Sequence, residues 1–171
     1  MAKSKHQCNL KIRQVKVTNL NYQPEKAGPD KLTPRIDLSL EMETDDTEIS
    51  ELVRVRSGSN VVKTLWDKAG APVLLDATPI KFDIEFLGKC ELRFVNDEKN
   101  ESRHTFDSAK LKAISIEPRA DHKGLVKFQV RFDPEHALEF LGDIRIAQKA
   151  IFGFTGHGDD DGDNGKQQQL A

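Results

Sequence analysis

Histidine, aspartate and serine lie close together once in the chain, at His104, Asp107 and Ser108. A catalytic triad is built from residues brought together in space, and this short polar turn before a strand contains nothing that positions a base. The five histidines are dispersed without metal-ligand spacing. No phosphate-binding loop, dinucleotide fingerprint, zinc motif or nucleophile elbow is present. The sequence therefore predicts that the protein is not an enzyme and has no cofactor.

A run of aspartates near the C-terminus resembles the opening of a calcium loop. When Asp159, Asp161 and Asp163 are taken as its first ligands, the position that requires glycine holds Asn164. The position of the final bidentate glutamate holds Leu170. Because two geometric requirements of the loop fail, the sequence predicts no metal site.

Basic residues lie opposite the apolar residues in two predicted strands. Lys11 and Arg13 are in the first strand, and Lys127 and Arg131 are in a later one. Strands that lie near each other would join these side chains into a cationic stripe able to bind phosphates, flanked by Lys16 and Lys123. The alternative is an ordinary solvated strand face, on which lysine is common.

Two aromatic residues are candidates for stacking on bases. Tyr22 lies in a polar, proline-rich segment, and Trp66 lies on a short predicted helix between Lys63 and Lys68. Exposed aromatic rings next to basic residues are typical of proteins that bind single strands. Trp66 also fits a place in the core. The nine phenylalanines mostly alternate with polar residues and belong to the interior.

Alternating apolar residues predict strands over 9–18, 35–43, 80–86, 90–94, 111–116, 126–132 and 144–152, with a bulge near Arg13 or Gln14. Residues 80–94 are predicted to form a hairpin that turns at Gly88-Lys89, and residues 19–34 a loop. Capping residues predict short helices at 44–53, 60–69 and 133–141. The expected fold class is mainly β (β-rich α+β): an antiparallel sandwich or partly open barrel of six to seven strands with two or three short helices.

The chain of 171 residues is expected to form one β-rich domain over 1–154 and a disordered acidic tail over 155–171. The tail carries a net charge of −3, against −2 for the whole chain, so the remainder is nearly neutral. Cys8 and Cys90 are interpreted as reduced core cysteines, although they could also meet in space. No secretory signal or membrane-spanning run is recognised, which predicts a cytoplasmic protein without membrane contact.

Two segments carry a family resemblance. The stretch Val17-Thr18-Asn19-Leu20-Asn21-Tyr22-Gln23-Pro24-Glu25-Lys26 with Pro34-Arg35-Ile36-Asp37-Leu38-Ser39-Leu40-Glu41, and the later Leu141-Gly142-Asp143-Ile144-Arg145-Ile146, resemble small bacteriophage proteins encoded near recombination genes. Those proteins resemble candidate phage single-stranded-DNA-binding proteins. The resemblance implies a role in DNA replication or recombination, in the host cell cytoplasm, and carries over no catalytic residue.

The expected function is a phage-type single-stranded-DNA-binding protein, sequence-independent, whose acidic tail modulates binding. Its candidate binding residues are Lys11, Arg13, Lys16, Tyr22, Trp66, Lys123, Lys127 and Arg131. Expected partners are single-stranded DNA and a phage recombinase or other replication protein, and a homo-oligomer is allowed. The alternative is a phage structural or adaptor module that binds another protein and whose tail confers solubility.

Overall fold

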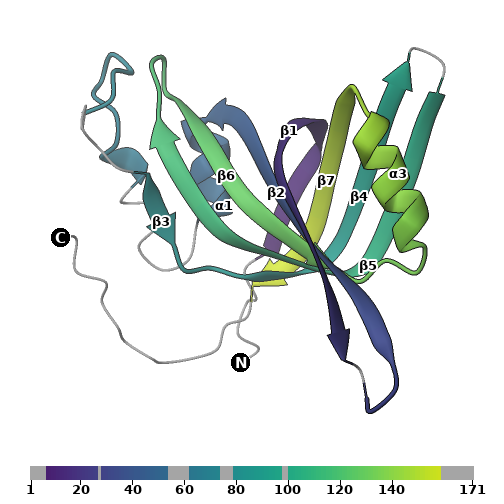
Figure 1. Ribbon diagram of the computed structural model, residues 1–171. Coiled ribbons are helices and arrows are strands. Elements are labelled where there is room, and N and C mark those ends of the chain that lie inside the picture. The colour runs from purple at the N-terminus through teal and green to yellow at the C-terminus, as the bar shows by residue number, and fades with distance from the viewer. Residues whose placement is uncertain (1–6, 27, 54–61, 74–78, 98–99, 159–171) are drawn as a thin grey trace.

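The computed structural model describes residues 7–26, 28–53, 62–73, 79–97 and 100–158. They form seven strands and two helices, shown in Figure 1. In chain order these are β1 (Gln7–Lys26), β2 (Leu32–Asp45), α1 (Asp46–Leu52), β3 (Ile80–Phe82), β4 (Phe86–Asp97), β5 (Asn100–Pro118), β6 (Lys123–Phe132), α3 (Ala137–Ile146) and β7 (Lys149–Gly158). In this part of the chain no helix is both long and apolar enough to cross a membrane.

All strands belong to one antiparallel sheet in the order β3-β5-β4-β7-β1-β2-β6. A further pairing between β5 and β6 joins the two sides of the sheet, so six strands form a closed ring and β3 lies outside it on β5. Strand residues alternate between the two faces, and the apolar ones point inward. The predicted fold class, a β-rich barrel or sandwich with few helices, is confirmed.

Aromatic packing fills the interior of the ring. Phe140 on α3 is fully buried and packs edge-to-face on Phe94 and Phe132, with ring centroids 5.3 and 5.1 Å apart. This contact places α3 against the end of the sheet formed by β4 and β5 (Figure 1). The short helix α1 is capped by Asp45, whose carboxylate accepts a hydrogen bond from the Glu48 N–H at 2.8 Å. A capping aspartate thus starts the helix at the predicted place.

The predicted loop over 19–34 is wrong. β1 continues to Lys26 and β2 begins at Leu32, so the two strands form a hairpin whose end projects from the ring (Figure 1). Pro24 and Pro34 lie directly opposite each other in this hairpin. Because proline has no N–H, the pair fits a position where hydrogen bonds do not cross between the two strands. Two prolines are therefore accommodated in a segment that composition alone indicates as a loop.

The predicted turn at Gly88-Lys89 is also wrong, because β4 runs through it without interruption. A side chain at Gly88 would place its Cβ 2.1 Å from the Thr155 carbonyl oxygen, and one at Gly156 would place it 2.4 Å from the Leu87 carbonyl oxygen. The two glycines face each other across β4 and β7. They allow a close approach of two backbones and do not form a turn.

The boundaries near the C-terminus differ from the prediction as well. α3 begins at Ala137 and ends at Ile146, and β7 begins at Lys149. β7 continues to Gly158, so four residues assigned to the tail are strand residues. Residues 155–157 pair with β1 and β4 on either side, and Gly158 pairs with β4. Residues 159–171, with all four tail aspartates, lie outside the described residues.

Candidate nucleic-acid interface

Basic side chains gather on the outward face where β5, β6 and β2 lie side by side. Strand register places Lys110 of β5 opposite Arg131 of β6, and Arg131 opposite Asp37 of β2. Lys112 follows two residues after Lys110, and Lys127 lies on the same outward side of β6. We call the set Arg35, Lys110, Lys112, Lys127 and Arg131 the basic face.

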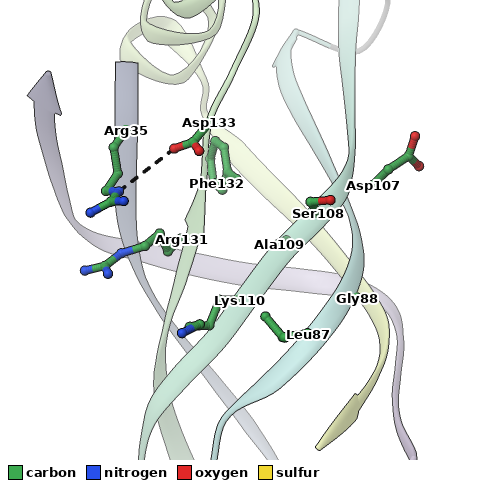
Figure 2. Close-up of a pocket in the computed structure, with 10 residues that line it drawn as sticks. All are labelled: Arg35, Leu87, Gly88, Asp107, Ser108, Ala109, Lys110, Arg131, Phe132 and Asp133. Atoms are coloured by element: carbon green, nitrogen blue, oxygen red, sulfur yellow. Dashed lines mark ion pairs between the residues drawn. The ribbon is translucent and has the colours of Figure 1, made fainter. Parts of the chain in front are cut away.

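A pocket of about 510 Å³ opens on the basic face and is drawn in Figure 2. Arg35, Lys110 and Arg131 line it from three different strands, and their nitrogen atoms lie on the same side of the view. Asp133 lines the pocket 4.0 Å from the Arg35 Nε, whereas the Asp107 carboxylate points away from the three cations. Among the described residues, the buried Arg35 Nε has no hydrogen-bond partner.

Carboxylates compensate part of this positive charge. Arg131 donates to both carboxylate oxygens of Asp37, from Nε at 2.7 Å and from Nη2 at 3.1 Å. The hydrogen bond from Arg131 lowers the pKa of Asp37 against the effect of its partial burial, and Lys112 at 3.9 Å lowers it further. The same pair raises the pKa of Arg131. Asp37 is therefore ionised at neutral pH and holds Arg131 in place.

Two other cations of the basic face are paired at its edges. The Lys110 Nζ lies 3.1 Å from a carboxylate oxygen of Glu85, and Arg35 forms an ion pair with Glu25. Exposed ion pairs of this kind contribute about 0–1 kcal/mol to stability. A phosphate group can therefore replace one of these carboxylates at little cost.

The predicted binding residues occupy several places. Lys127 and Arg131 are on the basic face, and Lys16 and Lys123 are at its margin. Lys16 lies 3.3 Å from Glu41, and Lys123 lies 3.9 Å from Glu43. Both glutamates are on β2, which separates β1 from β6. The continuous stripe that neighbouring β1 and β6 would form is thus interrupted by an acidic strand.

Lys11 and Arg13 lie away from the basic face. Arg13 turns toward α1, where Nη1 donates to Glu48 at 2.6 Å and to the Thr44 hydroxyl at 3.3 Å. Lys11 lies where β1 pairs with β7, and it lines a separate pocket of about 310 Å³ together with Lys89. Arg13 is therefore a link between β1 and α1, and the predicted grouping of Lys11 and Arg13 with Arg131 is wrong.

Neither candidate aromatic residue is on the basic face. Trp66 is 6% exposed, and its indole N–H donates to the Arg119 carbonyl at 2.7 Å, so its ring belongs to the core and offers no surface for a base. Tyr22 is 45% exposed. Its partner across the hairpin is Ile36, which points inward, so Tyr22 lies on the opposite side of the sheet from Arg131.

Three members of the basic face were not predicted from the sequence, namely Arg35, Lys110 and Lys112. Lys110 and Lys112 flank the buried Leu111, and this alternation is a signal for two outward side chains on a strand. The strand prediction that began at Leu111 left Lys110 out. Arg35 stands at the first position of the predicted second strand, where its orientation could have been inferred from Asp37.

The two cysteines are not joined by a disulfide. Cys8 and Cys90 are free and buried, and they lie on β1 and β4, on either side of β7. Burial raises the pKa of each thiol to about 12. Within the described residues no group of three or more histidine, cysteine, aspartate or glutamate side chains could hold a metal ion.

The chain was compared with models of protein families, with curated proteins and with solved structures. None of these comparisons finds a match.

Proposed function

We propose that this protein binds single-stranded nucleic acid through the basic face without reading its sequence. The observation that carries the proposal is the strand register, which aligns Lys110 with Arg131 and places Arg35, Lys112 and Lys127 on the same outward surface. Lysine and arginine bind phosphates through charge and release condensed counterions, which gives affinity independent of base identity. The resemblance to phage proteins favours DNA and a role in phage replication or recombination.

The shape of the sheet favours a single strand over a duplex. The basic face is on the outside of a closed ring of strands, so its surface curves away across β5, β6 and β2. A duplex has a persistence length of about 150 base pairs, so bending 20–30 base pairs around such a curve costs of order 1–6 kcal/mol. A single strand is flexible and can place successive phosphates on neighbouring strands of the sheet.

The acidic C-terminal segment is proposed to compete for the same face. β7 ends at Gly158, which lies opposite Phe86 of β4, and Phe86 lies opposite Leu111 of β5. Gly158, which precedes the last thirteen residues of the sequence, therefore lies two strands away from Lys110 and Lys112. Four aspartates occur within the first five of those thirteen residues. A local polyanion that occupies the basic face part of the time lowers its apparent affinity for phosphates.

The experiment is a fluorescence-anisotropy titration of oligo-dT and of a matched duplex at several salt concentrations. We expect tighter binding of oligo-dT, with an affinity that falls as salt rises. Each phosphate contact adds about 0.7 to the slope of log affinity against log salt. Lys110→Gln with Lys127→Gln is therefore expected to flatten the slope by about 1.4.

A matched pair of substitutions serves as the control. Lys11→Gln with Lys149→Gln also removes two exposed positive charges, but from β1 and β7. We expect this control to leave the slope nearly unchanged. Equal effects of the two pairs, or equal affinity for single strand and duplex, would contradict the proposed interface.

A second candidate function is a phage structural or adaptor module that binds another protein. The observation in its favour is exposed apolar surface on the projecting hairpin, where Tyr22 is 45% and Leu32 is 62% exposed. Leu138 on α3 is 88% exposed. Absence of oligo-dT binding at low salt would favour this function over the first.

A further inference from the structure

The projecting hairpin has one apolar face. We call residues 19–26 of β1 and 32–35 of β2 the arm. Leu20, Tyr22 and Pro24 of β1 share a side with Leu32 and Pro34 of β2, whereas Asn19, Asn21 and Gln23 are on the other side. Leu20 and Pro34 are half-buried and the other three apolar residues are exposed. A two-stranded hairpin is marginally stable in water alone, so this face favours a partner.

The arm also has an unpaired edge. β1 pairs with β7 only as far as Val15 and with β2 from Lys16 onward. Between Val17 and Lys26, no described residue forms a strand pairing on the side of β1 away from β2. Alternate residues of a strand direct their N–H and C=O groups to opposite edges. Pro24 is at a position that does not bond to β2, and Leu20 and Tyr22 are four and two residues before it. Their N–H and C=O groups therefore also point away from β2, to the unpaired edge.

We propose that this edge pairs antiparallel with the same edge of a second copy of the chain, about a two-fold axis at Asn21. In this register Leu20 lies opposite the second copy's Tyr22, and Tyr22 lies opposite the second copy's Leu20. Each of these pairs exchanges two N–H···O bonds between copies. The proposal goes beyond nucleic-acid binding and does not require it.

The side chains at this edge suit a second copy. On the apolar face, Tyr22 of each copy packs on Leu20 of the other, an aromatic–aliphatic pair that stabilises antiparallel strands. On the polar face, Asn19 lies opposite Gln23 of the second copy, and Asn21 meets its own counterpart. All three are uncharged amides, so no like charges meet at the centre of the interface. Self-complementarity of this kind is what a two-fold interface requires.

The size of the contact sets its expected strength. Pairing over about five residues buries less surface than the roughly 1,200 Å² that marks the lower limit of stable interfaces. The dimer is therefore a weak one that forms as concentration rises. In the dimer β2, β1 and their counterparts form one continuous four-stranded ribbon. Its polar side carries Arg35 of both copies, the one member of the basic face that lies on β2.

The test measures the mass of the full chain by sedimentation velocity, without nucleic acid, between about 1 and 500 µM, a range that covers weak interfaces. We expect the mass to rise from 19.2 kDa toward twice that value. Asn21→Lys and Asn21→Glu each place like charges at the axis and are expected to remain monomeric. Mixed in equal amounts, the two variants place opposite charges there and are expected to dimerise again.

Two further variants keep the test decisive. Tyr22→Lys should abolish the dimer, whereas Leu138→Lys, which changes an even more exposed apolar residue on α3, should not. Circular dichroism of each variant shows whether it is folded. A wild-type chain that remains monomeric throughout overturns the proposal. So does a dimer that tolerates Tyr22→Lys, or a mixture of the two variants at position 21 that stays monomeric.

Discussion

Arg131 and Asp37 form a two-point ion pair between β6 and β2, with hydrogen bonds of 2.7 and 3.1 Å, at the centre of the basic face. The pair fixes the position of one cation and removes one positive charge from the face. The Asp37 side chain is 15% exposed, so its carboxylate is largely shielded from solvent.

Asp37→Asn is expected to tighten binding of oligo-dT by about two- to fivefold, because the charge it removes offsets up to about 1 kcal/mol of phosphate attraction. Glu139→Gln on α3 removes the same charge away from the face and should have no such effect. Anisotropy titrations at low salt measure both. Weaker binding by the Asp37→Asn variant would show that the ion pair, by holding Arg131 in position, contributes more to binding than the removal of a negative charge does.

The same substitution should change the response of stability to acid. The lowered pKa of Asp37 means that its ion pair stabilises the fold above the unfolded pKa of about 3.9. That stabilisation is lost as the pH falls through the lower pKa that Asp37 has in the folded protein. The Asp37→Asn variant should therefore be less stable than the wild type at pH 7 and approach it near pH 2. Urea unfolding at the two pH values provides the comparison.

Truncation after residue 158 should leave the stability of the fold unchanged, whereas truncation after residue 154 should lower it. Residues 155–157 pair with both β1 and β4, Gly158 pairs with β4, and each lost hydrogen bond costs about 1 kcal/mol. We expect the shorter chain to lose at least about 3 kcal/mol, which lowers Tm by roughly 6–12 °C for a protein of this size. Thermal melting of the two chains tests this. Equal melting temperatures would show that the end of β7 contributes nothing.

Gly156→Ala should destabilise the protein by about 1–3 kcal/mol or more, because the new methyl group meets the Leu87 carbonyl oxygen at 2.4 Å and the Phe154 ring at 2.8 Å. Gly142→Ala on α3 is the matched control, since no atom lies within 4 Å of its new Cβ. Alanine is favoured over glycine in a helix by about 0.5–1 kcal/mol, so this variant should gain stability. Opposite shifts in urea midpoint are expected, and shifts of the same sign would contradict the close approach of β4 and β7.

Replacing Asp159, Asp160, Asp161 and Asp163 with asparagine should tighten oligo-dT binding at about 20 mM salt and change it little at about 200 mM. The reason is that screening weakens the competition between the aspartates and phosphate as the Debye length shortens. Lys166→Gln, which makes the segment more acidic, should shift affinity the other way. Titrations of the full chain at both salt concentrations measure the effect. An equal gain at both concentrations would argue against competition.

Alternation of apolar and polar residues was sufficient to predict a β-rich fold. Along β2 the buried residues alternate with more exposed ones, and the buried ones are Ile36, Leu38, Leu40 and Met42. Successive side chains of a strand point to opposite faces of the sheet, regardless of which strands are its neighbours. Asp45 was predictable as a helix cap for a similar local reason. Prediction failed at 19–34 because prolines and asparagines, which usually indicate a loop, are accommodated here by the register between β1 and β2.

Tertiary structure alone decided which basic residues lie side by side. The sequence shows that Lys127 and Arg131 point outward, but not that Lys110 and Asp37 are their neighbours. That information lies in the strand order, which places β6 between β2 and β5 and keeps β1 apart from it. Strand order is determined by how all the apolar strand faces pack around one core. The free energy of that packing is spread over many contacts between residues far apart in the sequence. No short stretch of sequence contains it, because register and neighbours arise only when the ring of strands closes.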